Sequence, residues 1–314
     1  MPVNADKPHL WKQDIAASVD LFNTWFMKFA PKAYRNTRLK VTRQVENALL
    51  LTDDLRGLNV ALLQSQPQIL PTLRMCTCPP LARDRLIGLA RVSKALVDTM
   101  EAGSLPPRLS PALLAENLAL LVRTISRMLD RDILPWIAAR RPASDVERHR
   151  ASTIVADRLC GSVSDPIVRN AQEKRQLALI ADYLRKKGYR QQSPQTGRPL
   201  TDMEPGTFAF RVNLLVGEAI KIPIDVVIQP KVVRTGRLPI LIEAKSAGDF
   251  TNVNKRRKEE AAKMHQLRKT YGEQVEFILF LCGYFDSGYL GYEAAEGIDW
   301  IWEHRLDDLA QLGI

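Results

Sequence analysis

The stretch IPIDVVIQPKVVRTGRLPILIEAKSAGDF, residues 222–250, places three ionisable groups inside two apolar runs that are typical of buried β-strands. Asp225 lies in the first run, and Glu243 and Lys245 lie in the second. An unpaired charge in a sheet core costs on the order of several kcal/mol. Because the strands themselves offer nothing to offset that cost, the three groups indicate a functional cluster.

The two runs are predicted to pair as a β-hairpin. A proline bounds each end of the first run, and Gly236 lies in the connection, where a reversing loop needs it. Side chains alternate between the two faces of a strand, so Glu243 and Lys245, two residues apart, point to one face. Pairing then brings Asp225 beside both of them.

Two neighbouring carboxylates repel each other unless a cation lies between them, and hard oxygen ligands select Mg²⁺, for which Mn²⁺ can substitute. Such a metal acts as a Lewis acid on a phosphodiester, while Lys245 orients the attacking water or offsets charge at phosphorus. The alternative is an ordinary cross-strand salt bridge between Lys245 and either acid. Three residues at this spacing also occur by chance.

Four consecutive cations follow the second run, in KSAGDFTNVNKRRKEE, at the predicted start of a helix. Cations at a helix N-terminus oppose the helix dipole, so stability does not explain them, whereas a DNA backbone crossing this turn does. The alternative is a solvated charged face that continues through Glu259 and Glu260. The predicted DNA-binding residues are Asn252, Asn254, Lys255, Arg256, Arg257 and Lys258.

The order of these features resembles the PD-(D/E)XK nucleases: Asp225, then Glu243 and Lys245 on the next strand, then a basic helix and an apolar strand. More narrowly, PIDVVIQP, EAKSAGDFTNVNKRRKEEA and NAQEKRQLALIADYLRKKGY resemble type II restriction endonucleases of the XamI group. This resemblance implies Mg²⁺-dependent, site-specific cleavage of double-stranded DNA, with Asp225 and Glu243 as metal ligands and Lys245 as the catalytic lysine. The proline lies two residues before Asp225, where the motif's name has it adjacent.

In such nucleases a helix before the sheet often supplies a further acid near the metal, and Glu173 is the corresponding residue here. Its helix is predicted from Leu177, Ile180 and Leu184, which recur on one face, and from Gly188 at the expected end. The alternative is that Glu173 complements the dipole of the helix that it begins.

The first half of the chain is predicted to be helical, with amphipathic segments at 14–29, 36–56, 81–101, 110–136 and 144–160. We therefore expect an α+β or α/β protein with two domains. A helical domain over residues 1–164 would serve DNA recognition, dimerisation or both. A PD-(D/E)XK-like core over residues 165–314 would contain a central mixed β-sheet flanked by helices.

The net charge of +10 is unevenly distributed. Residues 1–190 hold 30 Lys and Arg against 18 Asp and Glu, whereas residues 271–314 hold 1 against 9. A basic balance favours a nucleic-acid partner, although ribosomal contacts or an anionic membrane would use the same sign. No run approaches ~18 apolar residues, so no membrane span is predicted. Cys76 and Cys78 form a lone C-x-C pair, which favours reduced thiols in a cytoplasmic protein.

Two other functions are consistent with these residues. One is a structure-specific repair nuclease or junction resolvase on the same core. The other is a non-catalytic DNA-binding module in which the acidic pair is bridged to Lys245. A restriction enzyme that cuts both strands at a short palindrome is most simply a two-fold symmetric homodimer, which is the expected assembly.

Overall fold

The computed structural model describes residues 2–193, 200–217, 220–232, 238–250 and 253–314. Its internal contacts divide the chain into two units. Unit 1 comprises Met1–Phe29 and Val168–Ile314, and unit 2 comprises Ala30–Ile167. Two long helices, α1 (Pro8–Leu51) and α8 (Asp145–Lys186), contribute residues to both units.

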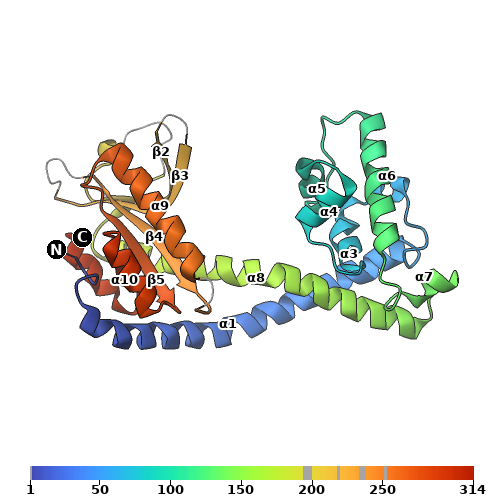
Figure 1. Cartoon of the computed structure of the whole chain (residues 1–314), viewed down its shortest axis with the longest axis horizontal. Helices are drawn as coiled ribbons and strands as arrows, with labels where there is room; N and C mark the ends of the chain where they lie inside the picture. Colours follow the sequence, from blue (N-terminus) through green and yellow to red (C-terminus); the bar gives the residue numbers. More distant parts are fainter. Residues whose placement is uncertain (1, 194–199, 218–219, 233–237, 251–252) are drawn as a thin grey trace. The chain divides into compact units, whose positions relative to one another are not determined.

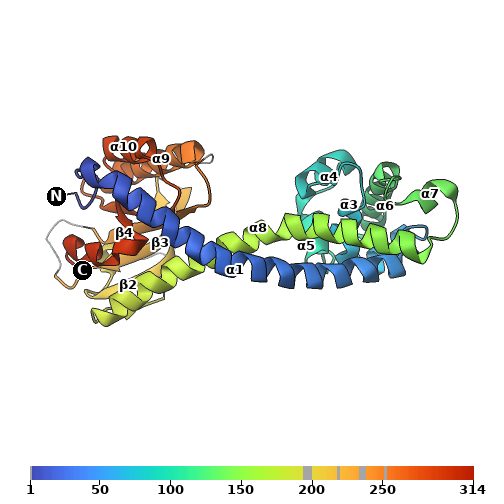
Figure 2. The same ribbon diagram turned by 90° about the horizontal axis from the view of Figure 1, so that it is seen from below.

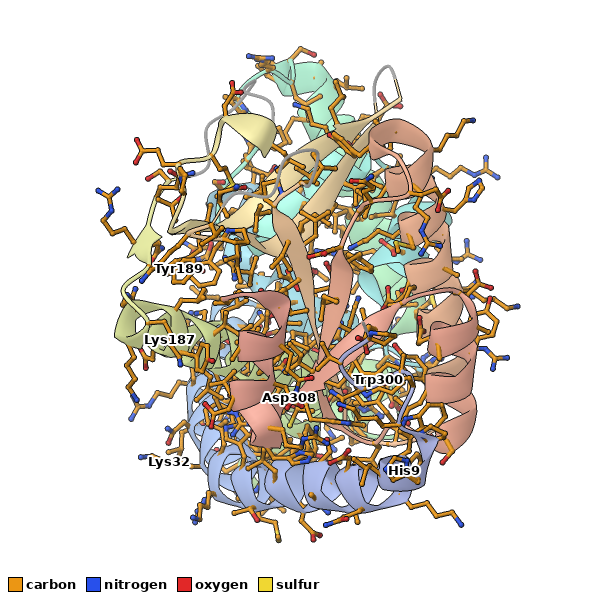
Figure 3. The ribbon with its side chains drawn as sticks, turned by 90° about the vertical axis from the view of Figure 1, so that its left-hand side faces the viewer. His9, Lys32, Lys187, Tyr189, Trp300 and Asp308 are labelled. Carbon is orange, nitrogen blue, oxygen red and sulfur yellow. The ribbon has the colours of Figure 1, made fainter. Side chains whose placement is uncertain are left out.

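This division differs from the predicted boundary after residue 164, because residues 1–29 pack within unit 1. The Asn4 side chain donates to the carbonyl of Trp300 at 2.8 Å and to Asp308 at 3.3 Å, and Figure 3 labels both partners. The rings of Trp11 and Trp300 meet edge to face, with centroids 5.5 Å apart. An amphipathic pattern identifies the buried face of a helix, but it does not identify the core against which that face packs.

Unit 1 contains a mixed sheet in which six strands follow chain order within the described residues. Strand pairs β2–β3 and β3–β4 are antiparallel, and β1–β2, β4–β5 and β5–β6 are parallel. This arrangement confirms the predicted fold class. The strands are β1 (Arg190–Gln191), β2 (Thr207–Val216), β3 (Ile220–Gln229), β4 (Ile240–Ala247), β5 (Phe277–Gly283) and β6 (Asp299–Trp302).

Helices cover both faces of this sheet (Figures 1 and 2). On one face, α9 (Val253–Tyr271) and α10 (Ser287–Ala295) bury side chains such as Leu267 and Leu290 among apolar strand residues. On the other face, the C-terminal part of α8 packs with residues of the 3₁₀ segment η3 (Glu303–Leu312). A short 3₁₀ turn, η2 (Leu200–Asp202), precedes β2. Residues 298–309 contain β6 followed by most of η3.

The regular elements of unit 2 are helices, apart from an isolated β-bridge between Thr77 and Leu129, and the unit has its own apolar core. The segment predicted as one helix at 81–101 is interrupted by Arg91, whose φ of +55° ends the first helix, and Ser93 caps the second. Its complete helices are α2 (Val60–Ser65), η1 (Pro67–Ile69), α3 (Leu70–Met75), α4 (Arg83–Ala90), α5 (Lys94–Glu101), α6 (Pro111–Met128) and α7 (Pro135–Ala139).

The long helices join segments that the sequence predicts separately. The expected helix at 14–29 and most of that at 36–56 belong to α1, which ends at Leu51, and α8 covers 145–160 of the helix expected at 144–160 together with the helix of Glu173. Each long helix contains a proline, Pro31 in α1 and Pro166 in α8. A proline removes one backbone hydrogen bond, and packing on both sides of it sustains the helix here.

Two chemical expectations can be compared with the described residues. All four cysteines are free thiols there, and burial raises the pKa of Cys76 to about 12. Among the helices described, none has a stretch that is both long and apolar enough to cross a bilayer.

Candidate active site

Strands β3 and β4 pair as the sequence predicts and bring Asp225 beside the β4 residues. The ladder joins Val226 to Ile242, and the same register continued by one residue puts Asp225 opposite Glu243. The backbone N–H of Ala244 donates to Asp225 Oδ2 at 2.9 Å. This bond fixes the aspartate against the edge of β4.

Glu243 and Lys245 share the face of β4 that α9 covers, as period-two alternation predicts. Lys245 Nζ lies 3.2 Å from Glu243 Oε1 and 3.0 Å from Glu260 Oε1. Lys263 Nζ lies 2.8 Å from the same Glu243 oxygen, and it also donates to the carbonyl of Pro223 at 3.1 Å. Two acids and two lysines therefore form one ion-pair cluster between β4 and α9.

The electrostatics of the cluster follow from its burial. Burial, and after it the charge of Glu243, raise the pKa of Asp225 to about 6, against the lowering effects of the Ala244 N–H and Lys245. Burial alone lowers the pKa of Lys245, but Glu260 and Glu243 more than offset it, so the pKa is raised. Lys245 is therefore a cation at neutral pH, whereas ionisation of Asp225 at neutral pH costs folding free energy.

Several polar residues of this site were missed by the sequence analysis. Glu260 was considered only as part of a solvated face, and that is wrong, because it is 1% exposed and contacts Lys245. Helical spacing was the available signal, since Glu260 and Lys263 are three residues apart on one side of α9. Glu293 of α10 is fully buried, and burial and then Glu260 raise its pKa to about 8. Gln176 of α8, 1% exposed, donates to the carbonyl of Lys245 at 3.3 Å.

The β2–β3 ladder has an irregularity at Asp225 itself. Phe210 packs in the core on the α8 face, whereas Val212 packs in the core on the α9 face, so alternation along β2 changes phase between them. Arg211 lies at that point with φ +53°, directly across the ladder from Asp225. A left-handed backbone costs an L-residue other than glycine roughly 1–2 kcal/mol. Irregularities of this kind re-aim strand side chains beside active sites.

Glu173, the predicted auxiliary acid, lies in α8 and forms an ion pair with Arg211, with Nη2 2.9 Å from Oε1. It lies close enough to Asp225 to contribute to the raised pKa of that group. Glu173 thus interacts with Arg211 and with Asp225, whereas Glu243 is paired with Lys245 and Lys263.

The predicted DNA-binding residues fall at the start of α9, where the description is incomplete. Asn252 lies outside the described residues. Asn254, Lys255 and Arg256 belong to the first turns of α9, and only their backbone is described. The guanidinium of Arg257 lies over the ring of Tyr292 at 4.8 Å from its centroid. Lys258 is exposed to solvent.

The carboxylates of this cluster suit a divalent cation in number and kind. Among the described residues, no group of three or more His, Cys, Asp and Glu side chains is arranged to hold a metal. Mg²⁺ needs fewer protein ligands, because it usually binds through one or two carboxylates together with waters and substrate phosphates. Glu243 Oε2 is buried and has no hydrogen-bond partner within the described chain. This unpaired oxygen of Glu243 and the carboxylate of Asp225 on the neighbouring strand therefore suit a cation that binds to both acids.

Comparison with known proteins agrees with this geometry. The model of the XamI restriction endonuclease family matches residues 53–302. The chain therefore belongs to the XamI restriction endonuclease family, which confirms the resemblance found in the sequence.

A curated relative extends the match to the whole chain. The type II restriction enzyme SalI of Streptomyces albus G is 53% identical over 313 residues, which are 99% of each protein. No solved structure matches the chain. Membership of this family makes the chain an endodeoxyribonuclease that cleaves DNA at specific sequences.

Proposed function

We propose that Asp225, Glu243 and Lys245 form the catalytic centre with which this type II restriction endonuclease hydrolyses phosphodiester bonds of double-stranded DNA. The observation that carries the assignment is the pair of acids facing each other across β3 and β4, with the Lys245 ammonium on the same side of β4 as Glu243. Burial raises the pKa of Asp225, and within the described residues no cation forms an ion pair with it, which supports a role other than a plain salt bridge.

Asp225 and Glu243 would hold a divalent cation, with Glu173 as the auxiliary acid. The cation is assigned as Mg²⁺, for which Mn²⁺ can substitute, because both prefer carboxylate and phosphate oxygens. When bound, it supplies Lewis-acid polarisation of the scissile phosphate. Its positive charge would also offset the burial and the repulsion from Glu243 that together raise the pKa of Asp225.

Lys245 supplies a fixed positive charge beside the reacting phosphate. Its ammonium is held between Glu243 and Glu260, and Gln176 fixes the strand behind it through the Lys245 carbonyl. In the reaction, water attacks phosphorus and the P–O bond to the leaving oxygen breaks. Lys245 orients that water and stabilises the charge that accumulates on the phosphoryl oxygens.

The remaining parts of the chain are assigned to DNA binding and assembly. Residues 30–167, which form unit 2, contain 20 Lys and Arg against 13 Asp and Glu, a balance that suits a DNA backbone. The basic start of α9 is assigned to phosphate contacts near the site. A homodimer would present two catalytic centres to the two strands of a palindrome.

Digestion of a plasmid of known sequence tests this function. Purified protein with Mg²⁺ should produce discrete fragments whose number is fixed by the sequence, and a chelator should stop the reaction. Random smearing or cleavage restricted to branched DNA would overturn sequence-specific cutting. Retardation of DNA without cleavage in the presence of Mg²⁺ would overturn the catalytic assignment in favour of a DNA-binding module.

A further inference from the structure

We propose that Arg211 binds a phosphate of the DNA backbone next to the scissile bond. This role rests on the proposed catalytic centre at Asp225 and extends it by a substrate-binding residue. It follows from three features of Arg211: its backbone conformation, the exposure of its side chain, and its place opposite Asp225.

The backbone at this position does not call for an arginine. The φ of +53° places Arg211 in the left-handed region, which glycine adopts freely and which asparagine tolerates. The change of phase in β2 serves Asp225, and either of those residues would produce it with less strain. Strained positions of this kind occur where function requires them.

The side chain contributes too little to folding to explain its presence. It is 63% exposed, and its one described ion pair joins it to Glu173, which is itself 36% exposed. Exposed ion pairs add little to stability because water screens them and because both side chains lose freedom. An arginine that strains the backbone without a compensating burial is best explained by a ligand.

The chemistry of the side chain identifies that ligand as a phosphate. A guanidinium presents a planar fork of N–H donors that matches two oxygens of one phosphate, which an ammonium cannot do. Glu173 accepts from Nη2 and so restrains the guanidinium. In return, Arg211 offsets the charge of Glu173, which would otherwise repel DNA approaching the acids.

The ladder fixes where such a phosphate would lie. Pairs flanking this step join Phe210 to Val226 and Val212 to Ile224, so Arg211 and Asp225 occupy the same step of β2 and β3. A phosphate on Arg211 therefore lies beside the one that reacts at Asp225. Arg211 would thereby fix which phosphate of the DNA backbone lies at the proposed catalytic centre.

Replacement of Arg211 by glycine separates this role from a structural one. Arg211→Gly removes the guanidinium and relieves the left-handed strain, so the melting temperature should stay unchanged or rise. Binding to a duplex that the wild type cuts, measured by anisotropy without divalent metal, should weaken. The slope of log affinity against log salt should become shallower by about 0.9, the value for one lost phosphate contact. Single-turnover cleavage with Mg²⁺ should slow by at least ~10-fold.

Two further variants complete the experiment. Arg211→Lys keeps the charge and the backbone strain, so it should retain the salt slope and lose part of the cleavage rate. Arg190→Ala is the matched control, because Arg190 is an exposed arginine of the same sheet paired with an exposed acid, Glu204, at 3.3 Å. It should match the wild type in slope and rate.

A wild-type salt slope and rate in Arg211→Gly would overturn the phosphate role, and so would a lower melting temperature with an unchanged slope. If the proposed catalytic centre were wrong, the experiment would give a different set of results. In that case the wild type itself would bind DNA without cutting it, while the salt slopes of the variants would still report on Arg211.

Discussion

Buried acids are compensated differently in unit 2 and in the cluster between β4 and α9 of unit 1. In unit 2, each buried acid faces an arginine: Asp54 lies 2.8 Å from Arg148, and Asp130 lies 2.9 Å from Arg158. In unit 1, Asp14 and Glu303 are paired in the same way, with Arg305 and Arg175, but the buried acids between β4, α9 and α10 lie close together. Within the described chain, Glu243 and Glu260 both form ion pairs with Lys245, and burial followed by the charge of Glu260 raises the pKa of Glu293.

This contrast separates structural charges from functional ones. A one-to-one ion pair keeps an acid ionised and holds two segments together. A group of acids with raised pKa values costs folding free energy, and such groups are characteristic of reactive sites. Breaking an ion pair of unit 2 should therefore lower the free energy of unfolding. Replacing an acid or lysine of the proposed catalytic centre should lower the cleavage rate.

The largest effect is expected from Lys245→Ala. If Lys245 stabilises the transition state, the single-turnover cleavage rate should fall by at least ~10², because charge stabilisation of this kind is worth a few kcal/mol. DNA binding should persist. Near-normal cleavage together with a large drop in melting temperature would show that Lys245 only neutralises the acids, as in unit 2.

In unit 2, Arg158→Ala should lower stability instead. The variant leaves the buried Asp130 without its cation, and it also removes a donor to the Met75 carbonyl. Stranding a buried charged partner costs about 2 kcal/mol, which lowers the melting temperature by roughly 4–8 °C. Arg83→Ala, which breaks the exposed pair with Asp98, is the control and should cost under ~1 kcal/mol. Equal shifts in both variants would remove the distinction between buried and exposed pairs.

Glu293→Gln should raise stability, and only at high pH. The folded-state pKa of about 8 lies above the unfolded value, so the fold holds a proton on Glu293 and loses stability as pH rises between the unfolded value and about 8. Glutamine does not ionise. The variant should therefore melt several degrees above the wild type at pH 8.5, and much of this difference should vanish at pH 5. A pH-independent difference would contradict the raised pKa.

The smallest effect is expected at the start of α9. Lys258→Ala should weaken DNA binding and make the slope of log affinity against log salt shallower by about 0.9, because one phosphate contact is lost. Lys269→Ala, an exposed lysine near the other end of α9, is the charge-matched control. The same small change in both variants would mean that Lys258 belongs to a solvated face.

Local patterns were sufficient to predict the cluster at the centre of the candidate site. Asp225, Glu243 and Lys245 lie on neighbouring strands, so period-two alternation and a hairpin bring them together without knowledge of the rest of the chain. The mixed sheet with flanking helices also followed from the order of the segments and from the family resemblance.

Other features depend on contacts between distant segments. The packing of residues 1–29 in unit 1 and the contact of Gln176 with β4 leave no local signal in the sequence. Glu260 was misjudged because a charge run looks alike whether it faces water or a buried lysine. The left-handed backbone of Arg211 could not be predicted, because arginine has no preference for that conformation.

Asp225→Asn tests the central claim most directly, when cleavage and thermal unfolding are measured on one preparation at pH 8. The folded-state pKa of Asp225 is raised to about 6, so the protein loses stability as the pH rises from the unfolded value to about 6, and the full cost of ionising Asp225 is present at pH 8. Asparagine removes this cost together with the proposed metal ligand. The variant should melt at or above the wild-type temperature and should not cleave DNA with Mg²⁺. Retained cleavage, or a folded state that depends on the Asp225 carboxylate as unit 2 depends on its ion pairs, would contradict the account.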